Sequence, residues 1–309
     1  MRNVTAALLA VCLPACSGLR HGNGPQPIPE VAFTSFSAVK PNTTVAMTNG
    51  DSRSVSGTYV NALPNITIQT VNSPVTDAGT GNTTLKLTYD ASKTVSGIAF
   101  STPSGGATFN RGNGTTLTCT SGVCNAQNSS GLAVVLDGTT LPAGWNYQTF
   151  GVWAQVTTST SFQAGAISAG VLTPASAVPT TGTATFTGIA NGLFVQYIGG
   201  VPPGTLSTTT ATMVANVDFL NRNIGFSTTA SMQTPLNGAL PFSNPALDMT
   251  GTWTYAAGSN SFTGSVTTSG MSGTASGRFY GPTAQEIGGT FSLSGSSGVF
   301  VGGFGGKRP

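Results

Sequence analysis

Charged residues and histidine are scarce in this chain of 309 residues. Only 6% of the residues are Asp, Glu, Lys or Arg, against roughly 25% in an average soluble domain. The 11 basic and 8 acidic groups include no basic cluster, and a nucleic-acid footprint needs clustered Lys and Arg. The single histidine, His21, lies in a stretch rich in Gly and Pro. Acid–base catalysis and transition-metal binding rely heavily on histidine. The composition therefore argues against a nucleic-acid partner, a metal site and histidine-dependent catalysis.

The sequence also lacks the motifs of covalent catalysis. A nucleophile elbow needs G-x-S-x-G, and the nearest run, Ala166 to Gly170, lacks the first glycine. The carboxylates of Asp137, Asp218 and Asp248 fall at expected strand ends or turns, where Asp commonly makes local hydrogen bonds. We therefore expect a binding protein rather than an enzyme, with no catalytic residues.

What the chain has in abundance is typical of strands and turns. It holds 42 glycines and is 39% hydrophobic, and Thr, Ser and Asn fill much of the remainder. β-Branched Thr and Val suit a pleated sheet, and Gly and Asn supply the positive φ angles of tight hairpins. No long stretch repeats with the helical period of 3.6 residues. The fold class predicted is all-β.

Alternating patterns divide the chain into two β regions. Residues 30–172 form the first, where Tyr147, Gly151 and Trp153 would share one strand face. Residues 173–309 are more regular and predict eight strands, at 183–189, 208–219, 222–232, 248–256, 260–267, 271–281, 285–294 and 298–304. Longer loops are expected at 190–206 and 233–247. Eight strands with one apolar face can close into a small antiparallel barrel, which removes exposed edges. An open sandwich would fit the same pattern.

The N-terminus is typical of an exported lipoprotein. Residues 1–15 combine Arg2 with an apolar run of about ten residues, which is too short to span a bilayer. Leu13-Pro14-Ala15-Cys16 follows and is similar to the lipobox of bacterial lipoproteins, which implies a diacylated, palmitate-bearing Cys16. Pro14 is an unusual residue at its position in this motif. The alternatives are a competing cleavage site before Cys12 and an ordinary secretory signal. Residues 16–29 would form a flexible tether.

Two further cysteines lie close together at Cys119 and Cys124. Their spacing suits a disulfide across a hairpin turn, which an oxidising compartment allows. The alternative interpretation is that the two cysteines are metal ligands, but no His or further Cys is near in sequence to complete a tetrahedral site.

The C-terminal region carries a motif from residue 277 to 291, which reads G-R-F-Y-G-P-T-A-Q-E-I-G-G-T-F. It is followed by a strand-like run, Gly298 to Arg308. Both resemble the barrel-closing pattern of the transferrin-binding protein B family of surface lipoproteins. The family pattern matches the following positions: Gly277, Phe279, Tyr280, Gly281, Pro282, Ala284, Glu286, Gly288, Gly289 and Phe291. We expect these residues to be structural, with Arg278 and Glu286 able to pair across the turn.

The resemblance covers residues 145–309 well and implies a handle domain followed by a barrel. This chain departs from the family in having one such lobe, whereas full family members have two. It implies a lipid-anchored protein on the surface of a bacterial outer membrane, exported by an outer-membrane translocator. It further implies iron or haem acquisition together with a TonB-dependent receptor. Because the long charged loops that grip transferrin are lacking here, transferrin binding does not carry over.

Ligand contacts would lie in the barrel loops, since loops vary over a rigid scaffold. The candidate residues share apolar or aromatic side chains in the two expected loops: Phe194, Tyr197, Ile198, Leu236, Leu240 and Phe242. No cofactor is required, although haem stays open as a ligand and would need Tyr or Met at the iron. The alternative function is a structural or adhesive surface lipoprotein without a small ligand.

Overall fold

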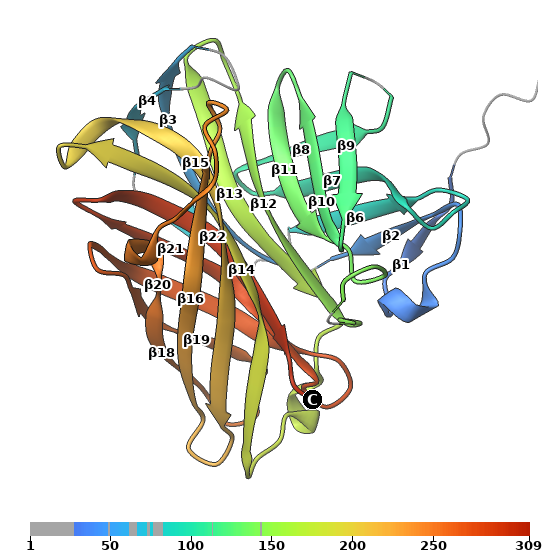
Figure 1. Ribbon diagram of the computed structural model, residues 1–309. Coiled ribbons are helices and arrows are strands. Elements are labelled where there is room, and N and C mark those ends of the chain that lie inside the picture. Colours follow the sequence, from blue (N-terminus) through green and yellow to red (C-terminus); the bar gives the residue numbers. More distant parts are fainter. Residues whose placement is uncertain are drawn as a thin grey trace, which may run out of the picture.

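The computed structural model describes residues 28–48, 50–61, 67–72, 75–76, 83–112, 114–142 and 144–309. The predicted signal peptide, Cys16 and all but the last two residues of the predicted tether lie outside these ranges. The described residues form strands, joined by turns and by three single-turn 3-10 segments (Figure 1). None of them forms a helix long and apolar enough to cross a membrane.

The N-terminal part is a sandwich of two sheets, here called the sandwich and covering residues 30–170. The first sheet has the order β1-β2-β6-β7-β8. Its strands are β1 (Glu30–Ala32), β2 (Thr43–Met47), β6 (Thr84–Tyr89), β7 (Val95–Thr102) and β8 (Gly105–Asn110). Strand β6 shows the alternation that builds the core, because Leu85, Leu87 and Tyr89 are buried while their neighbours are half-buried.

The second sheet runs in the order β9-β10-β11-β12-β13-β3-β4, and β5 also pairs with β3. Its strands are β3 (Asp51–Val60), β4 (Thr67–Val71), β5 (Val75–Thr76), β9 (Thr116–Thr120), β10 (Val123–Asn128), β11 (Gly131–Leu136), β12 (Gln148–Val156) and β13 (Ser161–Gly170). In β12, Trp153 packs into the core between the sheets, whereas Val152 and Ala154 face the barrel. The predicted two-faced pattern of this strand is confirmed, and both faces are buried.

The C-terminal part is a closed barrel of eight antiparallel strands. They are β14 (Thr183–Ile198), β15 (Val201–Asp218), β16 (Asn223–Pro235), β18 (Thr250–Tyr255), β19 (Ser261–Thr267), β20 (Met271–Tyr280), β21 (Glu286–Gly295) and β22 (Gly298–Lys307). The two-residue β17 (Phe242–Ser243) adds to β16. Pairing of β22 with β14, from Thr187 opposite Lys307 to Gln196 opposite Gly298, closes the circle. The eight predicted strands are confirmed, and the open sandwich is excluded.

The expected loop over 190–206 is wrong, because these residues continue β14 and β15 as a long hairpin. The hairpin is apolar on both faces. Phe194 points into the barrel core, while Leu193, Val195 and Leu206 pack against the sandwich. A strand buried on both sides loses the polar alternation by which sequence patterns are recognised. The turn falls at Gly199 and Gly200, both with positive φ.

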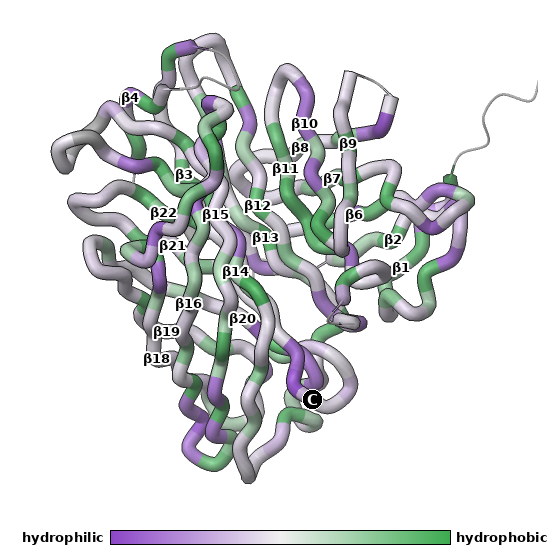
Figure 2. Tube along the Cα trace, in the orientation of Figure 1, coloured by the Kyte–Doolittle hydropathy of each residue, from purple (hydrophilic) through white to green (hydrophobic). Residues whose placement is uncertain are grey.

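The barrel lumen is filled with side chains. Trp253 is fully buried and stacks between Phe226 and Phe262, with ring centroids 4.4 and 5.4 Å away. The outward positions of β18 and β19 are hydroxyl residues and are exposed, whereas Trp253, Tyr255, Phe262 and Val266 are buried. In Figure 2 the barrel strands are mostly pale, between the hydrophilic and hydrophobic ends of the scale. The predicted apolar interior is confirmed. Because the lumen is packed, ligand contacts must come from the outer surface.

Candidate functional site

The 277–291 motif lies where β20 and β21 meet the sandwich, and its charged residues hold the two parts together. The predicted pairing of Arg278 with Glu286 is wrong. Arg278 donates from Nε and Nη2 to the carboxylate of Asp51 in β3, at 3.0 and 3.1 Å. The sandwich supplies the partners of both motif residues, so Arg278 and Glu286 each bond across the junction instead of with each other.

Glu286 is an acceptor for three consecutive backbone N–H groups. Its buried carboxylate accepts from Asn146, and at 2.9 Å from both Tyr147 and Gln148, in the segment that leads into β12. Burial raises the pKa of Glu286, although the three N–H donors and Lys307 oppose the rise. One side chain therefore fixes the sandwich backbone to the barrel.

The remaining contacts of the junction are hydroxyl bonds and glycine gaps. The Tyr280 hydroxyl lies 3.0 Å from Oγ of Ser168, and burial raises the pKa of Tyr280, so it stays protonated. A Cβ added at Gly288 would lie 2.5 Å from Oε1 of Gln148, and one at Gly305 would lie 2.2 Å from its Nε2. Only glycine leaves room for that buried side chain against the barrel wall.

The other motif residues serve the barrel itself. Phe279 and Phe291 belong to the lumen core, and Gly277 lies against the Phe262 ring. Gly281, with a φ of 83°, makes the turn after β20, and buried Ala284 has a φ of 58°. Gly289 lies against the Phe304 ring, Ile287 joins the lumen core, and Pro282 is exposed in the turn after β20.

The structure separates the six candidate contact residues into two groups. Phe194 is buried against Phe300, with ring centroids 6.0 Å apart, so it is a core residue. Tyr197 and Leu236 are half-buried and pack beside the apolar interface with the sandwich; burial also raises the pKa of Tyr197. Ile198 ends β14 at a register shift. These four positions belong to the hairpin and its support rather than to an open loop.

Leu240 and Phe242 are different, because their side chains are 84% and 44% exposed. They lie in the segment between β16 and the 3-10 turn at Pro245–Leu247, called here the 236–243 loop. Met232 on β16, 37% exposed, lies opposite Ser243. Exposed large apolar side chains in one short segment are characteristic of contact sites for other proteins.

The 236–243 loop is anchored by buried polar groups. Asn244 donates to Oε1 of Gln233 at 2.7 Å, and Gln233 donates to Gln196 and Ser207. The backbone N–H of Ser231 donates to Asp248 at 3.0 Å. These bonds fix the base of the loop on β16, so Leu240 and Phe242 are held out from a rigid support.

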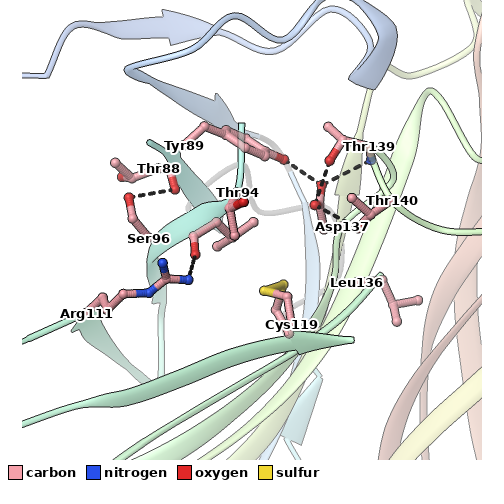
Figure 3. Close-up of a disulfide and its surroundings, with 12 residues drawn as sticks. Thr88, Tyr89, Thr94, Ser96, Arg111, Cys119, Leu136, Asp137, Thr139 and Thr140 are labelled. Atoms are coloured by element: carbon pink, nitrogen blue, oxygen red, sulfur yellow. Dashed lines mark hydrogen bonds between the residues drawn. A yellow bond between two sulfur atoms is a disulfide. The ribbon is translucent and has the colours of Figure 1, made fainter. Parts of the chain in front are cut away.

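The predicted disulfide is confirmed, with Cys119 and Cys124 paired across the β9–β10 hairpin at a Cα separation of 4.0 Å. Figure 3 shows that the neighbouring Asp137 is surrounded by hydroxyl groups. It accepts from Tyr89 at 2.9 Å and from Thr139 at 2.6 Å. Asp218 likewise accepts from the N–H groups of Leu220 and Asn221. These carboxylates are occupied by structural hydrogen bonds.

Sequence reasoning missed Asp51 and Arg53 as junction residues. Arg53 in β3 is buried and donates to the hydroxyls of Thr274, Ser276 and Ser292 on the barrel. The sequence did contain a signal for these residues, because Asp51 and Arg53 are only two positions apart in a chain with few charged residues.

The geometry defines a class: a β-sandwich docked on a closed eight-stranded barrel with a packed lumen. Residues 178–308 match the family model described as the C-lobe and N-lobe beta barrels of Tf-binding protein B. The C-terminal domain therefore matches the barrel model of this family, which confirms the resemblance found in the 277–291 motif.

Solved structures similar to this chain include transferrin-binding protein B from two bacteria and a haemoglobin receptor. A tryptophan-to-alanine mutant of transferrin-binding protein B from Haemophilus parasuis Hp5 has 16% identity and a TM-score of 0.42, over 85% of this chain and 76% of that one. The isotype 1 protein from serogroup B Neisseria meningitidis has 16% identity and a TM-score of 0.41, over 80% of this chain and 52% of that one. The apo haemoglobin receptor HpuA from Kingella denitrificans has 18% identity and a TM-score of 0.41, over 91% and 94%. This chain spans about half the length of the meningococcal protein. No curated protein matches it.

Proposed function

We propose that the protein is a non-enzymatic binding protein of the bacterial cell surface, acting in the acquisition of iron, haem or another nutrient. The barrel family supports this, since its members are parts of a transferrin-binding protein. The binding partner would be a protein that carries the nutrient. A TonB-dependent receptor would then take the nutrient up.

The observation that carries the proposal is the exposure of Leu240 and Phe242 on the anchored 236–243 loop. The Leu240 side chain is 84% exposed, so its burial contributes little to the stability of the folded protein. On association, about 1.5–3 kcal/mol is available from burying a side chain such as Leu240, and less from Phe242, which is 44% exposed. The loop also contains no charged residue that would have to be desolvated.

The test is a binding measurement with transferrin and haemoglobin as the two probes. We expect Leu240→Asp combined with Phe242→Asp to weaken binding of the recognised probe by at least about tenfold. The matched control is Leu220→Asp, which changes a leucine of 60% exposure in the β15–β16 turn at the other end of the barrel. Equal binding by both variants contradicts the loop assignment. Binding of neither probe by the wild type contradicts iron-carrier capture and favours the adhesive alternative.

We also propose that the protein is anchored to the outer membrane through acylated Cys16 and displayed outward by a translocator. The change Cys16→Ser should move the protein from the membrane fraction to the soluble fraction, and Cys12→Ser should leave it in place. Protease treatment of intact cells should degrade the wild-type protein. Protection from the protease in intact cells would contradict display at the surface.

A further inference from the structure

A cleft of about 800 Å³ lies between β3 of the sandwich and the outer face of β18, β19 and β20. It is distinct from the 236–243 loop and extends toward the Tyr255 end of β18. Figure 1 shows these three barrel strands side by side below the sandwich. The volume falls within the range of about 300–1,000 Å³ typical of small-molecule sites.

Hydroxyl groups from adjacent strands line this cleft in register. Thr254 on β18 lies opposite Thr263 on β19, and Thr263 lies opposite Ser276 on β20. Ser261 lies opposite Arg278, and Thr274 completes the wall. Directly opposite residues on neighbouring strands point to the same face. The cleft therefore presents a row of donors and acceptors at the spacing of the strands.

The charge in the cleft is positive and incompletely compensated. The charged residues of its lining are two arginines, Arg53 and Arg278, and one carboxylate, Asp51. Buried Arg53 donates only to neutral hydroxyls, and its Nε has no hydrogen-bond partner among the described residues. Burial lowers the pKa of Arg53 to about 10, although nearby Asp51 opposes the fall, so the group stays charged at neutral pH. A buried charge with neutral partners focuses its potential into the adjoining cleft.

Arg278 offers the accessible cationic group. Its side chain is 18% exposed, and Asp51 uses its Nε and Nη2. The Nη1 group is therefore left for a ligand, and an arginine nitrogen forms its strongest hydrogen bonds to a carboxylate or phosphate oxygen. A bare anion would fill little of the cleft and would leave most of the hydroxyl row in contact with solvent rather than with the ligand. A ligand with its own hydroxyls would match that row.

We propose that this cleft binds an acidic saccharide, with its carboxylate at Arg278 in the field of Arg53 and its hydroxyls along β19 and β20. The same wall continues as exposed hydroxyls at Ser265 and Thr252, beyond the cleft. A longer glycan can extend over them.

The test is calorimetric titration of the full protein with glucuronate, glucose and acetate. We expect glucuronate to bind at least about tenfold more tightly than glucose or acetate. The change Ser261→Glu places a carboxylate beside Arg278 and should weaken glucuronate binding by at least about tenfold. The matched control is Ser265→Glu, on the same face of β19 but outside the cleft lining, which should change binding by less than about twofold. Ser261→Gln adds similar bulk without charge and should retain binding.

Four results would overturn the proposal. If glucose binds as tightly as glucuronate, the carboxylate and the arginines are not needed for binding. If acetate binds as tightly as glucuronate, the saccharide ring is not needed. Equal weakening by Ser265→Glu places the ligand elsewhere. Absence of saturable glucuronate binding by the wild type rejects the site. None of these results depends on the 236–243 loop or on its partner.

Discussion

Glu286 offers the sharpest test of how the barrel holds the sandwich. The perturbation is Glu286→Ala, which removes the acceptor of three backbone N–H groups in residues 146–148. The chain has one other glutamate, Glu30, which is exposed and paired with Lys86 at 2.7 Å. The change Glu30→Ala is therefore a control with the same chemistry at a solvated position.

The magnitude follows from the contacts. A hydrogen bond to a charged group contributes about 1.5–3 kcal/mol, so three would give about 5–9 kcal/mol. Two effects reduce this figure. Burial disfavours the carboxylate, as its raised pKa indicates, and water entering the vacated space can reach the N–H groups. We expect a loss of about 3 kcal/mol for Glu286→Ala, and of less than about 1 kcal/mol for Glu30→Ala.

The assay is equilibrium urea unfolding of the full chain followed by tryptophan fluorescence. Trp145 precedes the anchored segment, and Trp253 lies in the barrel lumen, so the signal covers both sides of the junction. A loss below about 1 kcal/mol for Glu286→Ala would refute the reasoning. It would mean that the apolar interface alone determines docking.

Three other predictions concern the same architecture. Burial raises the pKa of Glu286 above its ordinary 4.5, so the folded protein binds this proton more readily than the unfolded chain does. The stability of the wild type relative to Glu286→Gln should therefore be greatest below pH 4.5 and should fall as the pH rises through the raised pKa. Urea unfolding across a range of pH measures this difference. Gly305→Ala should lower the free energy of unfolding by about 1–3 kcal/mol, whereas Gly225→Ala, where an added Cβ meets nothing within 4 Å, should change it by less than about 1 kcal/mol in thermal unfolding. Replacing Cys119 and Cys124 together by Ala should cost about 2 kcal/mol, and no loss in oxidised protein would contradict a role in stability.

The barrel was predictable because its strands obey one rule. Each of the strands β18 and β19 buries one face in the lumen and exposes hydroxyls on the other, so a period of two appears directly in the sequence. Trp253 and Tyr255 mark that face in β18. The disulfide was predictable for a similar local reason, since Cys119 and Cys124 flank a single tight turn.

The junction was not predictable in the same way. Leu193 and Val195 face the sandwich while Phe194 faces the lumen, which gives a continuous apolar run without period. Arg278 and Glu286 are near each other in sequence, yet their partners lie 227 and 138–140 residues away. Local spacing contains no information about such contacts. Of the candidate contact residues whose side chains the structure describes, only Leu240 and Phe242 are exposed large apolar side chains, because Phe194, Tyr197 and Leu236 belong to or support the long hairpin.

These contacts give the 277–291 motif a physical meaning beyond closing the barrel. Phe279 and Phe291 fill the lumen, whereas Arg278, Tyr280, Glu286 and Gly288 face outward to the sandwich. A sequence needs both sets only where a barrel wall is packed on both sides. The motif therefore marks a barrel with a docked neighbour, and a chain carrying it should have a β-sheet pressed against β21 and β22. The rigid junction that results leaves the loops as the surfaces free to vary with the partner.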